Sequence, residues 1–185
     1  FQNCWHWTIF GFRGARAKVN GGVFDGVNYE RMNQPYYPFD ASTNRLSFVF
    51  ESINNGRKIT KAVEYVPFPF DKTIYNLAFG DINENGELDD LSVSDNQDME
   101  KVLATVIQTI FVFFRTYPDK TLFFTGSTNA RTRLYRGAIG RVIDELQEGL
   151  LIEGIRNNNR ELFQKNVNYE AFLISLKPEY WYENK

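Results

Sequence analysis

Residues 45–66, RLSFVFESINNGRKITKAVEYV, decide the fold class of this chain. On both sides of Asn54-Asn55-Gly56, apolar and polar residues alternate, which is typical of strands with one buried face. An Asn-Gly pair between two such runs favours a tight hairpin, because both residues tolerate a positive φ. We therefore predict an antiparallel hairpin with strands over residues 45–53 and 58–66.

Outward from the hairpin, the same alternation predicts further strands, and helical spacing predicts two helices. The further strands are expected at residues 73–79, 88–93, 121–125, 150–156, 161–164 and 169–176. The first helix has Ser94 or Asp95 as its expected N-cap and ends before Pro118. The second helix opens at residues 126–128 and ends at Gly149.

The predicted order of elements is ββββαβαββ. Because short turns join most of the strands, we expect a single α+β domain with a largely antiparallel sheet and two helices packed on one face. The domain is expected to cover residues 32–185, ending in a short aromatic tail, Tyr180-Trp181-Tyr182, that docks back on it. Residues 1–31 carry an excess of basic residues and glycine, and we interpret them as an extra N-terminal segment that need not belong to the native domain. The alternative is a basic arm that contacts a partner.

Composition excludes several classes of protein. The chain has 185 residues, of which 43% are hydrophobic and 24% charged, as in globular domains. Its net charge of −2 argues against a uniformly basic nucleic-acid binder. Cys4 and His6 are the only cysteine and histidine, which excludes an internal disulfide framework and argues against a Cys/His zinc cluster or a histidine general base. The apolar runs are too short to span a membrane.

Residues 81–100 form an acidic segment with eight carboxylates and no lysine or arginine. Five of its residues match positions of an EF-hand loop: Asp81, Asn83, Asn85, Gly86 and Asp89. The bidentate glutamate of such a loop is replaced by Ser92, and a strand pattern precedes the segment. We therefore expect a polar turn and no cofactor. The candidate ligands for Ca²⁺ or Mg²⁺ are Asp81, Asn83, Asn85 and Asp89.

Residues 126–141 form a basic segment with four arginines and no acidic residue. A strand enters this segment and a helix begins in it, and a helix N-terminus offers N–H groups and partial positive charge to phosphate. Guanidinium groups add fork-shaped donors for phosphate oxygens. The predicted ligand-binding residues are Gly126, Ser127, Thr128, Arg131 and Arg133. The alternative is that these arginines pair with the acidic segment.

Residues 35–177 also resemble a small bacterial domain family of unknown function. The motifs that carry this resemblance are YNLAFGDINENGELDDL, MEKVLATV, GSTNARTRLYR and NYEAFL. The family's proteins begin near Met32, which supports the interpretation of residues 1–31. The resemblance implies a bacterial, cytoplasmic protein and no particular activity.

The sequence favours a domain that binds a phosphate-bearing ligand, either a nucleotide or RNA, at residues 126–133. Two alternatives stay open. One is a nuclease-type toxin of a toxin–antitoxin pair, with Arg131, Arg133, Tyr135 and Lys101 as catalytic candidates. The other is a protein-interaction module that uses the acidic segment. The sequence leaves open whether the protein is an enzyme and which oligomer it forms.

Overall fold

The predicted hairpin consists of β3 (Ser47–Asn54) and β4 (Arg57–Pro67) in the computed structural model, which describes residues 17–19, 34–89, 96–147 and 149–180. The two strands pair antiparallel from Ser47 opposite Glu64 to Asn54 opposite Arg57. Asn55 and Gly56 take φ values of 48° and 80° at the turn. Positive φ at both central residues is what the Asn-Gly signal predicts.

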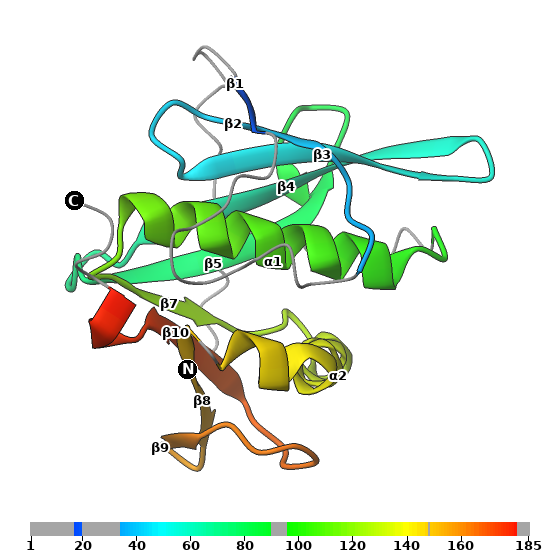
Figure 1. Ribbon diagram of the computed structural model, residues 1–185. Helices are drawn as coiled ribbons and strands as arrows, with labels where there is room; N and C mark the ends of the chain where they lie inside the picture. Colours follow the sequence, from blue (N-terminus) through cyan, green and yellow to red (C-terminus); the bar gives the residue numbers. More distant parts are fainter. Residues whose placement is uncertain (1–16, 20–33, 90–95, 148, 181–185) are drawn as a thin grey trace.

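Within the described residues, ten strands form one sheet in the order β1-β2-β3-β4-β5-β7-β10-β8-β9, and β6 pairs with β5 (Figure 1). The remaining strands are β1 (Ala17–Val19), β2 (Phe39–Ala41), β5 (Ile74–Ile82), β6 (Leu88–Asp89), β7 (Thr121–Phe124), β8 (Leu150–Arg156), β9 (Asn159–Leu162) and β10 (Ala171–Leu176). In this sheet, β5 and β7 are parallel and the other pairs are antiparallel. The predicted fold class is confirmed. The structure adds β1 and β2 to the predicted order, because three-residue strands are too short to show an alternation. It has three closing strands, as the ranges 150–156, 161–164 and 169–176 predicted, although the order ββββαβαββ counts only two.

The helices α1 (Met99–Thr116) and α2 (Asn129–Leu146) pack on the same face of the sheet, as predicted. Tyr75 of β5 contacts Phe113 of α1, with ring centroids 5.3 Å apart, and Phe124 of β7 contacts Tyr135 of α2 at 6.1 Å. Tyr75 is the register partner of Leu122, two residues before Phe124, so all three side chains lie on one face. Neither helix is long and apolar enough to cross a membrane, a finding limited to the described ranges.

Aromatic side chains hold α1 against the sheet. Phe113 is fully buried and stacks on Tyr65 of β4 with a centroid distance of 4.6 Å. The phenolic oxygen of Tyr65 lies 2.8 Å from the Thr109 hydroxyl, so the buried polar end of this ring also has a partner on α1. Burial of each such ring stabilises the fold by about 2 kcal/mol. This packing fixes where α1 begins and ends.

Both helices begin at the same edge of the sheet. β5, β7 and β8 run in one direction, because β7 and β8 are both antiparallel to β10. The carboxyl end of β7 leads directly into α2, and the carboxyl end of β5 leads through the short strand β6 to α1 (Figure 1). Ligands of open sheets bind beyond the carboxyl ends of such strands. This edge of the sheet is therefore where we expect a ligand site.

The predicted terminal segments are described in part. Residues 17–19, which form β1, come from segment 1–31 and pair with β2, and the rest of that segment lies outside the described residues. At the other end, Pro178–Tyr180 form a short 3₁₀ helix (η2), and Tyr180 packs against the hydrophobic core. Trp181 and Tyr182 of the aromatic tail lie outside the described residues.

Candidate functional site

The junction between β7 and α2 has the geometry of a capped helix start. Thr128 is the N-cap, and its hydroxyl accepts a hydrogen bond from the Arg131 backbone N–H at 3.2 Å. The Thr132 hydroxyl accepts from the Gly126 N–H at 3.1 Å and donates to the Thr128 carbonyl at 3.2 Å. Helix α2 thus begins where the sequence predicted.

Gly126 packs directly against the first turn of α2. A Cβ atom built on Gly126 would lie 2.3 Å from the Thr132 backbone nitrogen and 2.7 Å from the Arg131 carbonyl carbon. Gly126 is one of the ligand-binding residues predicted from the sequence. The contact that requires a glycine here is an approach to the helix itself.

The four arginines of the basic segment have different surroundings. Arg131 is half-buried and Arg133 is exposed, both in the first two turns of α2. The Arg136 guanidinium donates to the Val167 carbonyl at 3.3 Å and to the Asn168 side-chain oxygen. Arg141 lies 4.0 Å from the exposed carboxylate of Glu100, which gives one contact between the basic and acidic segments. An exposed pair at this distance contributes little stability.

Two of the catalytic candidates belong to different clusters. The Lys101 ammonium lies 3.9 Å from the centre of the Tyr37 ring at the start of α1. Tyr135 packs edge-on against Phe124 and lines an apolar cavity of about 50 Å³ between α1 and α2. A cavity of this size holds only a few water-sized groups. The described contacts therefore do not bring Lys101 and Tyr135 together.

The acidic segment forms the turn between β5 and β6. Asp81 forms an ion pair with the buried Lys61 and is the register partner of Asp89. The Asn83 side-chain oxygen accepts hydrogen bonds from the backbone N–H groups of Asn85 at 3.0 Å and Glu87 at 2.9 Å. Among the described residues, no cluster of three or more His, Cys, Asp or Glu side chains has the arrangement of a metal site. The Asp81 carboxylate therefore serves the ion pair with Lys61, and the Asn83 side-chain oxygen serves the turn.

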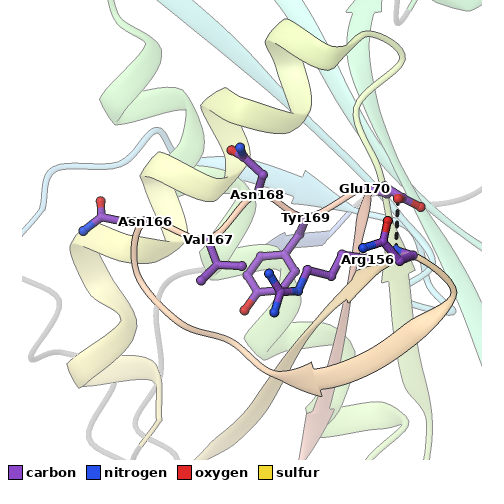
Figure 2. Close-up of a pocket in the computed structure, with 7 residues that line it drawn as sticks. Arg156, Asn166, Val167, Asn168, Tyr169 and Glu170 are labelled. Carbon is purple, nitrogen blue, oxygen red and sulfur yellow. Dashed lines mark hydrogen bonds between the residues drawn. The ribbon is translucent and has the colours of Figure 1, made fainter.

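A polar pocket of about 510 Å³ lies at the edge where α2 begins (Figure 2). It is lined by Arg156, Asn157, Asn166, Val167, Asn168, Tyr169 and Glu170. The sequence analysis nominated none of these residues as a site. Two signals were present in the sequence: the run Asn157-Asn158-Asn159, and the pair of asparagines in the segment that precedes β10.

Asparagines in the left-handed conformation shape this pocket. Asn157, Asn158 and Asn166 have φ values of 49°, 60° and 68°. Asparagine tolerates this region better than other residues with a side chain. The Asn157 backbone N–H donates to a Glu170 carboxylate oxygen at 3.1 Å, the bond drawn in Figure 2. This bond ties the β8–β9 turn to the segment before β10.

Tyr169 forms the inner wall of the pocket. Its ring lies over Gly154 of β8, where a Cβ atom would be 2.2 Å from the ring. Its hydroxyl accepts from the Gln164 N–H at 3.1 Å and donates to the Leu162 carbonyl at 3.4 Å. Burial raises the pKa of the Tyr169 phenol, so this wall stays neutral near pH 7.

Direct contacts join the polar pocket to the β7–α2 junction. Thr125, the residue before Gly126, donates a hydrogen bond from its hydroxyl to the Glu170 carbonyl at 2.6 Å. Farther along α2, Arg136 contacts Val167 and Asn168 (Figure 2 shows α2 passing beside Asn168). The junction and the pocket are therefore adjacent parts of one surface.

Comparisons with known proteins identify a family and no activity. One similar solved structure is an acetyltransferase of the GNAT family from Streptococcus pneumoniae, 11% identical, with a TM-score of 0.34, covering 73% of this chain and 70% of that chain. No curated protein matches the sequence. A family model described as a family of unknown function matches residues 33–177. This match covers most of the chain and confirms the family resemblance, so the protein belongs to this family of unknown function, DUF6934.

Proposed function

We propose that this domain binds a phosphate-bearing ligand at the start of α2. The observation that carries the proposal is the charge of that helix terminus. Helix α2 has 18 residues and no acidic residue in its first turn, while Arg131 and Arg133 lie in its first two turns. The N-terminus of such a helix carries a partial positive charge of about half an elementary charge. An anion is the ligand that this terminus favours.

The groups that would contact the phosphate come from both sides of the helix start. The first N–H groups of α2 point out of the helix end, and the hydroxyls of Ser127 and Thr128 lie beside them. The guanidinium of Arg133 is exposed, and that of Arg131 is half-buried. Because the two residues lie about 200° apart around the helix, we expect one of them to contact the phosphate directly and the other to raise the local potential.

The same site could hold a mononucleotide or the backbone of RNA. The nuclease alternative would also require a group that moves a proton at this site, and Lys101 is engaged with Tyr37 at the start of α1. Binding without cleavage is therefore the function that we propose. The protein-interaction alternative predicts a basic partner and no dependence on Arg131 or Arg133.

Titration of the full chain at low and high salt tests the proposal. Nucleoside monophosphates and a labelled RNA oligonucleotide are added at 20 mM and 300 mM NaCl, and binding is followed by calorimetry and fluorescence anisotropy. We expect binding that weakens as salt rises, because phosphate contacts release counterions. Arg131→Gln/Arg133→Gln should weaken binding about tenfold or more.

A variant with the same change of charge elsewhere provides the control. Arg57→Gln/Lys72→Gln removes two exposed cations outside α2, one at the start of β4 and one in the loop before β5, and should leave binding within about twofold of the original. Equal losses in both double variants would mean that net charge alone attracts the ligand. The absence of binding at low salt would disprove the proposal, and cleavage of the RNA would favour the nuclease alternative.

A further inference from the structure

We infer that the polar pocket binds the nucleoside part of a nucleotide whose phosphate lies at the start of α2. This inference rests on the proposed function and specifies its ligand. It concerns residues that lie on the β8–β9 turn and before β10, outside the junction itself.

The pocket offers hydrogen bonds in both directions and little net charge. Three carboxamides, from Asn157, Asn166 and Asn168, each carry a donor and an acceptor. The carboxylate of Glu170 and the guanidinium of Arg156 have opposite charges, and Arg156 is also paired with Glu161 at 3.0 Å. A second phosphate group does not suit this pocket, because a phosphate has no hydrogen-bond donors for the carboxamide and carboxylate oxygens. A neutral ring system with donor and acceptor edges suits the pocket.

The hydrogen bonds already formed in the pocket show which groups are held in place. The Glu170 carboxylate accepts a hydrogen bond from the Asn157 backbone N–H, and the Arg136 guanidinium donates one to the side-chain oxygen of Asn168. The side-chain NH₂ group of Asn168 is left as a donor. The side chains of Asn157 and Asn166 are exposed at the pocket, and neither amide makes a side-chain hydrogen bond within the described part of the chain. Both amides lie on residues with a left-handed backbone and are available to a ligand.

The distance between pocket and junction fits a ligand with two parts. Asn129 begins α2, and Arg136, which contacts the pocket loop, lies seven residues later. Seven residues correspond to about 10 Å along a helix. Glu170 lies closer to the junction, because its carbonyl accepts from Thr125. A nucleotide places a sugar between its phosphate and its base, so it can extend along this surface from the helix start into the pocket.

A comparison of ligands and variants tests the inference separately from the proposed function. The full chain is titrated with the four common nucleoside 5′-monophosphates, the matching nucleosides and ribose 5-phosphate. We expect at least one monophosphate to bind about tenfold more tightly than ribose 5-phosphate, and its nucleoside to bind measurably without the phosphate. Asn157→Gly/Asn166→Gly removes two amide side chains and retains the left-handed backbone. It should weaken both the monophosphate and the nucleoside about tenfold, as expected for two hydrogen bonds.

Asn55→Gly is the matched control, because Asn55 is an exposed turn residue with a φ of 48° in the distant β3–β4 hairpin. It should leave binding unchanged. Backbone amide shifts in NMR spectra give a second measurement, with changes expected at residues 157, 168 and 170. The inference would be overturned if ribose 5-phosphate bound as tightly as every monophosphate and if Asn157→Gly/Asn166→Gly left binding unchanged. The proposed function would then remain intact. If nucleosides bound as tightly as monophosphates, and if this binding did not depend on Arg131 and Arg133, the proposed function would be overturned. Binding of the nucleoside part in the pocket would still stand.

Discussion

The starts of α1 and α2 occupy equivalent places in the fold and are built in opposite ways. Each helix has 18 residues; α2 directly follows the carboxyl end of β7, and α1 follows β5 after the short strand β6. At the start of α1, the Asp98 carboxylate accepts hydrogen bonds from the hydroxyls of Tyr37 at 2.7 Å and Ser52 at 2.6 Å. At the start of α2, Thr128 bonds its own helix and no carboxylate is present in the first turn.

This difference separates a helix terminus that is held by tertiary contacts from the one at which we propose a ligand site. The start of α1 is occupied by tertiary contacts: Lys101 covers the Tyr37 ring, Thr105 accepts from the Tyr37 backbone N–H at 2.9 Å, and Glu100 adds negative charge. The start of α2 has no acidic residue in its first turn, and Thr125 just before it donates a hydrogen bond to the carbonyl of Glu170, which lines the polar pocket. A helix terminus becomes a candidate site when the rest of the fold does not already satisfy it.

The largest expected effect is at the α2 start, where Gly126→Ala would drive a methyl group into the helix backbone. We expect a loss of about 3 kcal/mol in the free energy of unfolding, because backbone atoms cannot move aside as a flexible side chain can. Gly137→Ala is the control. It lies in the middle of α2 with no atom within 4 Å of the added methyl group, and should gain about 0.5–1 kcal/mol. Urea denaturation measures both, and equal effects would contradict the close packing of Gly126.

The next effect is at the α1 start, where Asp98→Ala removes the acceptor shared by Tyr37 and Ser52. We expect a loss of about 2 kcal/mol, since Ser52 is fully buried and retains only the bond from Asn96. Asp144→Ala serves as the control. Asp144 forms an exposed pair with Lys165 at 2.9 Å, and its loss should cost less than about 1 kcal/mol. A small effect of Asp98→Ala would mean that this network does not fix α1.

A smaller effect is expected from the cap of α2. Thr128→Ala removes the acceptor of the Arg131 N–H and should lower the free energy of unfolding by about 1 kcal/mol. Thr116→Ala, at the exposed last residue of α1, should change it by less than about 0.5 kcal/mol. Thermal denaturation of the two variants distinguishes a cap from a general effect of removing threonine.

The smallest expected effect is a response of the α1 start to alkaline pH. Burial, followed by the hydrogen bond to Asp98, raises the pKa of the Tyr37 phenol above its ordinary value. The unfolded chain therefore loses this proton first, near pH 10. The stability that Tyr37 contributes is complete below pH 10 and is lost as pH rises towards the pKa in the folded state. Urea denaturation between pH 8 and 11 should show a shallower decline for Tyr37→Phe, and an unchanged decline would contradict the assignment.

Local patterns in the sequence were sufficient to predict the fold class. Alternation around Asn55-Gly56 identified the central hairpin, and Thr128 with the apolar line after it identified the start of α2. These signals are readable because turn geometry and helix capping depend on residues a few positions apart. The predicted cap of α1 is the instructive failure. The helix begins at Met99 with Asp98 as N-cap, later than Ser94 or Asp95, and the Asp98 side chain makes no capping bond.

The family match places the chain among relatives of unknown function and leaves the site to be inferred from geometry. The sequence correctly located a helix terminus with an excess of arginine. It gave no reason to connect that terminus with the Asn157 turn or with Glu170, which lie about 30 and 40 residues later in the chain. Those residues contribute ordinary turn signals when they are considered one segment at a time.

The sequence by itself determined the central hairpin, the longer strands, the two helices and the separation of acidic from basic charge, because each depends on neighbours along the chain. The tertiary structure alone decided that the start of α1 is occupied by contacts from residues far away in the chain. Tyr37 and Ser52 reach Asp98 across 61 and 46 residues, and Thr125 reaches Glu170 across 45. Such contacts depend on the order and register of strands in the sheet, and no local pattern encodes that order.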